Sequence, residues 1–264
     1  YSQYFDYIDI AIDDEKVFNS LVVGEKVKMY HYTHRNEDGL LDFAHKRNFL
    51  VSKCQADWYF RLDTDDEIIN PQNIREVAEK AEEEGLSFVT CYYDYAVDEW
   101  GNTCLAHYRE TLVKNDKNLY WNKPIHETVL PINPSKFTFS SNDDIRIKHH
   151  RDAKASEESA KRNFAYLIAE YKRDGEKTDP RTLAYLGRTL MGFGDFNKAI
   201  YFMEKHIEKS GWDEDRYLSW CLMADIYTRQ DKFTQATACA FEALQECPEF
   251  PEAYYQLHDI YFQQ

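Results

Sequence analysis

The sequence contains no Cys-x-x-Cys pair, although six cysteines are spread over its 264 residues. This spacing excludes a zinc site built on paired thiolates and a small scaffold held together by disulfides. Isolated thiols suit a reducing compartment, so we expect a cytoplasmic protein. The cysteines are Cys54, Cys91, Cys104, Cys221, Cys239 and Cys247.

Long apolar runs and an excess of positive charge are also missing. The chain has no signal peptide and no stretch of about 18 apolar residues, so we expect neither export nor a membrane span. Its 32 basic residues stand against 47 acidic ones, and the formal net charge is −15. Nucleic-acid backbones and anionic membranes attract positive charge. Non-specific binding to either partner is therefore not expected.

The residues that are present describe a globular protein with an α/β region at its start. Hydrophobic residues make up 43% of the chain and charged residues 30%, which is typical of a folded core. Strand and helix patterns alternate early, and antiparallel strands gather later, so a mixed α/β domain is predicted over residues 1–152. Strands are predicted at 7–12, 26–32, 56–62, 86–97, 103–113 and 145–150, and helices at 42–54 and 70–85.

Beyond residue 152 the periodicity becomes helical. Two helix pairs are predicted, followed by a single helix at 253–262; the pairs are 183–191 with 196–207, and 218–227 with 233–244. Leu186 and Leu222 occupy equivalent places, as do Ala199 and Ala236. A period in the middle thirties with small residues at helix crossings is the tetratricopeptide pattern. We expect an all-α, tetratricopeptide-like domain over 153–264, with a plain helical subdomain as the alternative.

An acidic stretch organises the first domain. Residues 56–62 read as a buried strand, and four acidic side chains follow within five residues: Asp63, Asp65, Asp66 and Glu67. Carboxylates this close repel one another unless a cation shares them, and oxygen ligands suit Mg²⁺ or Mn²⁺. Ligands of open α/β sheets bind beyond the carboxyl ends of strands. The alternative is a solvated turn that caps the next helix. An EF-hand loop is excluded, because Ile68 and Ile74 stand where it needs Gly and Glu.

Two more strand ends carry charged or imidazole groups. Asp13 and Asp14 end the first strand, His149 and His150 end the last, and a His126–Glu127 pair lies in a loop before it. A metal held by carboxylates and an imidazole, with an acid–base residue nearby, would make a phosphoryl- or nucleotide-handling centre. Taken singly, a His at a strand end is more often a hydrogen-bonded structural residue.

In their order along the chain, these elements resemble the core of family 2 glycosyltransferases of the A-type fold. The resemblance rests on Asp13, on Lys46-Arg47-Asn48, on Asp57-Trp58 and on the stretch from Leu62 to Glu67. The later Trp121, Ile125-His126-Glu127 and Ile147-Lys148-His149 are similar to elements of bacterial members with C-terminal tetratricopeptide repeats. The resemblance implies an A-type mixed-sheet domain that binds a nucleotide sugar, followed by the helical repeats.

The resemblance also implies a role for each matching residue of the donor site. Asp13, with Asp14 beside it, would bind the base or ribose of the donor. Asp63 would face the ribose or sugar and join the metal site. Asp65 would hold the metal that bridges the diphosphate, and Arg47 would contact the donor or its phosphates.

The later elements of the resemblance imply further metal ligands and a catalytic base. His149 would be a further metal ligand, with His150 as the alternative. Glu127 would be the base that takes the proton of the acceptor hydroxyl, and His126 is the second candidate. The reaction implied is a Mn²⁺- or Mg²⁺-dependent transfer from a nucleotide-activated sugar, a UDP-sugar first, to an acceptor such as a glycan or peptide, with inversion at the anomeric carbon.

Some alternatives stay open on the sequence. The first alternative to a glycosyltransferase is a tetratricopeptide interaction protein with an inactive nucleotide-binding domain. The second alternative is a nucleotidyltransferase. Such an enzyme is expected to have a Gly-rich phosphate loop, and none is visible in the sequence. The helical repeats would either present the acceptor or pair two copies of the chain. Family members usually have one more strand before that of Asp13 and a small polar loop after Asp14, so we expect that the given chain lacks these pieces.

Overall fold

A computed structural model describes residues 1, 3–150 and 153–263 as mixed α/β structure followed by a C-terminal helical region. The chain divides into two compact units, Tyr1–Ser156 and Glu157–Gln264, and each is described by itself. The division falls inside helix α4 (Ala153–Asp174).

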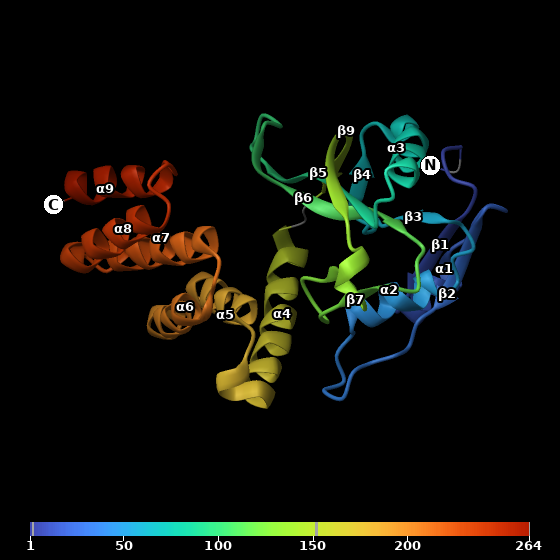
Figure 1. The fold of residues 1–264 in the computed structure, drawn as a ribbon. Helices are drawn as coiled ribbons and strands as arrows, with labels where there is room; N and C mark the ends of the chain where they lie inside the picture. Colours follow the sequence, from blue (N-terminus) through green and yellow to red (C-terminus); the bar gives the residue numbers. More distant parts are fainter. Residues whose placement is uncertain (2, 151–152, 264) are drawn as a thin grey trace. The chain divides into compact units, whose positions relative to one another are not determined.

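The first unit contains three sheets, drawn in blue to yellow-green in Figure 1. Strands β1 (Ile8–Ile12) and β2 (Val27–His31) pair in parallel, with α1 (Glu15–Ser20) between them in sequence. Five strands form a mixed sheet in the order β3-β6-β5-β9-β4, and β7 pairs with β8 antiparallel. The strands are β3 (Trp58–Phe60), β4 (Asp66–Ile68), β5 (Phe88–Val97), β6 (Thr103–Lys114), β7 (Leu119–Asn122), β8 (Thr128–Pro131) and β9 (Phe139–His149).

Local sequence signals fix several of these boundaries. The predicted helix at 70–85 is confirmed: a 3₁₀ turn, Pro71–Asn73, leads into α3 (Ile74–Glu83). The chain leaves α3 at Gly85 with φ +68°, the left-handed conformation that glycine adopts without a Cβ clash. The strands predicted at 86–97 and 103–113 form an antiparallel hairpin, in which Val97 pairs with Thr103.

The acidic stretch differs in part from the single strand predicted at 56–62. Strand β3 ends at Phe60, and Asp66–Ile68 forms a separate strand, β4. Strand β4 pairs antiparallel with the end of β9, so that Asp66 lies opposite His149. The backbone of the last acidic residues is therefore fixed by sheet hydrogen bonds, and their side chains point alternately to the two faces.

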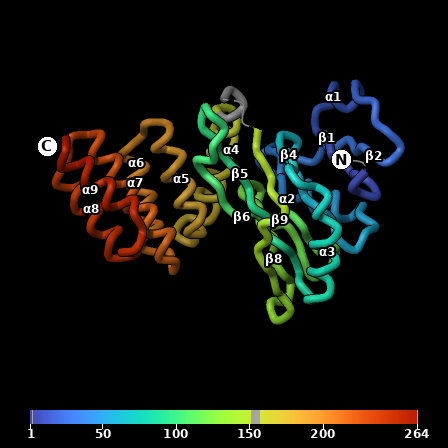
Figure 2. The backbone as a smooth tube through the Cα atoms, turned by 90° about the horizontal axis from the view of Figure 1, so that it is seen from above, coloured from blue at the N-terminus to red at the C-terminus, as the bar shows by residue number. Residues whose placement is uncertain are grey.

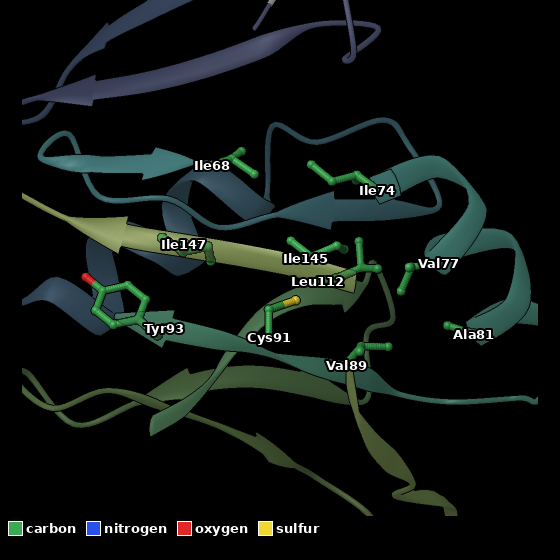
Figure 3. Close-up of a cluster of buried hydrophobic side chains, with 10 residues drawn as sticks. All are labelled: Ile68, Ile74, Val77, Ala81, Val89, Cys91, Tyr93, Leu112, Ile145 and Ile147. Atoms are coloured by element: carbon green, nitrogen blue, oxygen red, sulfur yellow. The ribbon is translucent and has the colours of Figure 1, made fainter. Parts of the chain in front are cut away.

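The five-stranded sheet has a buried cluster on each face. Figure 3 shows the cluster under α3, in which Ile74, Val77 and Ala81 of that helix meet residues of four strands. Those strand residues are Ile68, Val89, Cys91, Tyr93, Leu112, Ile145 and Ile147. A smaller cluster joins helix α2 (Phe43–Val51) to the sheet and to the β7–β8 hairpin through Ala44, Phe88, Val113, Trp121 and Val129. Strands β5 and β6 thus contribute alternate residues to the two clusters.

The second unit consists of packed helix pairs, and both predicted pairs are confirmed. Helix α5 (Pro180–Gly192) lies beside α6 (Phe196–Lys209), and α7 (Asp213–Arg229) lies beside α8 (Phe233–Glu246). Helix α9 (Glu252–Gln263) packs on α8, as the tube in Figure 2 shows. A short 3₁₀ turn, Gly175–Lys177, precedes α5. One buried cluster joins α7, α8 and α9 through Tyr217, Cys221, Ala243, Cys247 and Ala253.

The crossing of α5 and α6 depends on the missing side chain of Gly187. A Cβ at Gly187 would lie 2.7 Å from Cγ of Met203 and 3.3 Å from the carbonyl oxygen of Ala199. Overpacking at such a site costs about 1–3 kcal/mol, so we expect Gly187→Ala to lower the urea midpoint in far-UV circular dichroism. Gly192→Ala, with no atom within 4 Å of its Cβ, is the matched control. Equal midpoints for the two variants would contradict this account of the crossing.

Candidate functional site

Helix α2 carries three consecutive side chains that reach other segments of the first unit. The Nζ atom of Lys46 lies 2.7 Å from Oδ1 of Asp13 at the end of β1. Arg47 reaches the segment after β3 and the loop after β7. Asn48 bonds both to the carbonyl and to the amide of Trp121, at 2.8 and 2.9 Å. The Lys-Arg-Asn motif therefore ties together the segments that hold the predicted donor-site residues.

The two acids after β1 have different surroundings. Asp13 is paired with Lys46 and, at 3.7 Å, with Arg35. Partial burial acts to raise the pKa of Asp13, but the hydrogen bond and charge of Lys46 outweigh it, and the pKa is lowered. Asp14 caps helix α1 by accepting from the amides of Lys16 and Val17 at 2.8 and 3.0 Å. Asp13 thus remains a charged group at the strand end, whereas the Asp14 carboxylate has a local structural role.

Asp63 lies among three guanidinium groups. Its Oδ2 atom is 2.6 Å from Nη2 of Arg61 and 3.4 Å from Nη1 of Arg109, and its Oδ1 atom is 3.0 Å from Nη2 of Arg47. Burial acts to raise the pKa of Asp63, but the charges of these arginines hold it well below its usual range. Asp63 is therefore an anion held in place by cations, and its carboxylate is not part of the group of metal-ligating atoms described below.

Arg61 is the least accessible member of this network. Its side chain is 5% exposed, and its Nε and Nη1 atoms are buried without a hydrogen-bond partner among the described residues. Burial, together with the neighbouring charge of Arg47, lowers the pKa of Arg61 to about 10. A buried guanidinium without a carboxylate partner would be an uncompensated charge, which costs free energy. The charge of Arg61 therefore holds the Asp63 carboxylate in position.

The predicted base lies in the loop between β7 and β8. The Glu127 side chain is 6% exposed, and its Oε1 atom accepts from Nε of Arg47 at 3.2 Å and lies 3.1 Å from Nη2 of the same guanidinium. His126 has φ +53°, a left-handed conformation that costs free energy for a residue with a Cβ. The structure therefore joins Glu127 to the network of Asp63 through Arg47, and it holds the His126–Glu127 turn in an unusual conformation.

A second group of side chains forms where β4 meets the end of β9. Asp65, Asp66 and His149 each offer one ligand atom, and these atoms lie within 4.8 Å of one another. The Asp65 side chain is 55% exposed, whereas that of Asp66 is 1% exposed. Two carboxylates and an imidazole are a donor set that suits Mn²⁺, Mg²⁺ or Zn²⁺. The residues present therefore fit a divalent cation at the edge of the sheet.

The structure thus brings together Asp65 and His149, which the sequence predicts as ligands of one metal. His150 is not in this group, because its Nε2 atom lies 2.8 Å from Glu67 Oε2. Asp66 is not among the metal ligands that the sequence predicts, although the structure places it in this group, and Ile68 on the same strand is buried. Residues two apart share a strand face, so Asp66 lies inside together with Ile68. The strand itself forms by pairing with β9, and no local sequence signal indicates it.

Comparison of the chain with protein-family models and with curated proteins finds no match. No helix in the described part of the chain is long and apolar enough to cross a membrane.

Proposed function

We propose that the first unit is a metal-dependent glycosyltransferase that uses a nucleotide-activated sugar. The observation that carries this proposal is the meeting of Asp65, Asp66 and His149 on two paired strands. A divalent cation held there would stabilise the negative charge of the departing nucleoside diphosphate. Mn²⁺ and Mg²⁺ are the ions favoured, because a diphosphate supplies further oxygen ligands.

The arginine network and the end of β1 would hold the rest of the donor. Asp13 is a partly exposed anion beside Lys46, which suits hydrogen bonds to a base or ribose. Asp63 is kept ionised and oriented by its arginines, so its carboxylate can accept from a sugar hydroxyl. Glu127, fixed by Arg47, would accept the proton of the attacking acceptor hydroxyl. We favour a UDP-sugar, an inverting transfer, and a glycan or peptide acceptor.

The role of the helical unit belongs to the same proposal. Stacked helix pairs form extended surfaces that bind partners. The tetratricopeptide-like pairs α5–α6 and α7–α8 would present the acceptor or pair two copies of the chain. A chain without transferase activity would use these surfaces as an interaction protein, and the experiment below separates this alternative from the enzyme.

A thermal-shift screen of the whole chain with UDP, GDP and dTDP, each with and without Mn²⁺, tests the proposal. Binding at a hundredfold excess over Kd stabilises the folded state by about 2.7 kcal/mol. We expect a nucleotide-dependent rise in Tm that requires Mn²⁺, followed by hydrolysis of the matching nucleotide sugar. Asp65→Ala should remove the metal dependence, and Glu67→Gln, a change in the same acidic stretch, should keep it. No response to any nucleotide would favour the interaction protein.

A further inference from the structure

The buried carboxylate of Asp66 already has three polar partners within the protein. The Tyr93 hydroxyl donates to Oδ1 at 2.5 Å, and Nδ1 of His149 lies 3.0 Å from the same oxygen. The backbone amide of Asp63 donates to Oδ2 at 3.1 Å. A cation placed on Oδ1 would meet hydrogens from both the hydroxyl and the imidazole. These contacts suit a carboxylate that positions its neighbours by hydrogen bonding. They are less suited to a carboxylate that binds the ion itself.

The imidazole of His149 is fixed from two directions. Its Nδ1 atom is directed at Asp66, and its ring stacks on Tyr95 with centroids 5.5 Å apart and planes 5° apart. The side chain is 16% exposed, and no hydrogen bond to Nε2 is found within residues 3–150. Figure 3 shows Tyr93 at the end of the cluster under α3, with its hydroxyl pointing away from the aliphatic side chains. The core thus positions the donor that meets Asp66.

We infer that Tyr93 and Asp66 form a hydrogen-bonded relay behind His149. The relay places the imidazole proton on Nδ1, which also lies 3.9 Å from Oδ2 of Asp65, and leaves Nε2 as the His149 atom that binds a cation. Asp66 and Tyr93 are then positioning residues, and His149 binds the metal through its outward nitrogen. Metal-binding histidines commonly donate their other nitrogen to a carboxylate in this way. The inference deepens the proposed function and rests on it for the identity of the ion.

The first test needs no metal. In ¹⁵N–¹H correlation spectra of the whole chain, labelled at histidine, we expect neutral His149 to carry its proton on Nδ1. Asp66→Asn and Tyr93→Phe should shift His149 toward the Nε2-protonated tautomer, whereas Tyr92→Phe should not. Tyr92 is the matched control, since it makes the same chemical change at the neighbouring position of β5, where its ring packs on Tyr108. An Nε2–H tautomer in the unaltered protein would overturn the relay.

The second test measures Mn²⁺ affinity from the EPR signal of the free ion. Loss of a group that orients a ligand typically costs 10–100-fold in metal affinity. We expect Tyr93→Phe to weaken Mn²⁺ binding about tenfold and Asp66→Asn somewhat more, with Tyr92→Phe unchanged. Equal affinities for Tyr93→Phe and Tyr92→Phe would overturn the relay. A protein with the Nδ1–H tautomer that binds no Mn²⁺ would contradict the proposed function and leave the relay standing.

Discussion

Asp63→Asn is expected to lower the free energy of unfolding by about 3 kcal/mol. The substitution leaves Arg47 and Arg61, whose side chains are 13% and 5% exposed, without their shared carboxylate. Removing one partner of a buried ion pair costs about 3–5 kcal/mol, because the remaining charge is uncompensated. The lower end of that range applies here, since the Asp63 side chain is itself 32% exposed. Urea unfolding of the whole chain measures the difference.

Asp65→Asn is the matched control for this prediction. Asp65 is two residues away and 55% exposed, so its substitution should change stability by less than about 0.5 kcal/mol. Equal losses for the two variants would contradict the structural role of Asp63.

The pH dependence of this difference has a definite sign. The pKa of Asp63 is lowered on folding, so its contribution to stability is complete above the unfolded pKa of about 3.9. That contribution is lost as the pH falls through the lower folded value. The advantage of the unaltered protein over Asp63→Asn should therefore persist from neutral pH to about pH 4 and shrink below it.

His206→Ala should destabilise the helical unit by a similar amount. His206 is completely buried, with Nδ1 2.8 Å from the Ser219 hydroxyl and Nε2 2.9 Å from Oδ2 of Asp215. Alanine leaves a cavity and removes the partner of Ser219, which is 1% exposed. A cavity and an unsatisfied buried hydroxyl together cost about 3 kcal/mol. Loss of the helical circular-dichroism signal on heating or in urea measures this effect.

His258→Ala is the control for the helical unit. Its side chain is 73% exposed and pairs with the adjacent Asp259 at 3.0 Å. Exposed ion pairs contribute about 0–1 kcal/mol, so this variant should unfold almost as the unaltered chain does. If His206→Ala unfolded at the same midpoint as His258→Ala, the buried network would not stabilise the helices.

The sequence predicted the elements whose signals are local. Apolar periodicity and turn residues place both helix pairs and α3, and Gly85 marks the end of α3. Strand β4 lacked such a signal, because Asp66–Ile68 is only three residues long and two of them are acidic. Its strand conformation comes from pairing with β9, far along the chain, which no local pattern encodes.

The candidate site shows the same limit. Asp65 and His149 follow from acids and histidines at strand ends, and the structure groups them. The three arginines around Asp63 come from α2, from the end of β3 and from β6. Their convergence depends on tertiary packing, so the sequence offered Arg47 through the resemblance and gave no indication of Arg61 or Arg109.

Strand β4 occupies the end of the order β3-β6-β5-β9-β4, and it meets β9 across a separation of 83 residues. A cation bound by the proposed ligands would act as a removable tether between these distant segments. It would close a long loop, which limits the conformational entropy of the chain between the two strands. It would stabilise the folded state by an amount that rises with the logarithm of its free concentration. The stability of this edge of the sheet would then depend on the concentration of divalent ions around the protein.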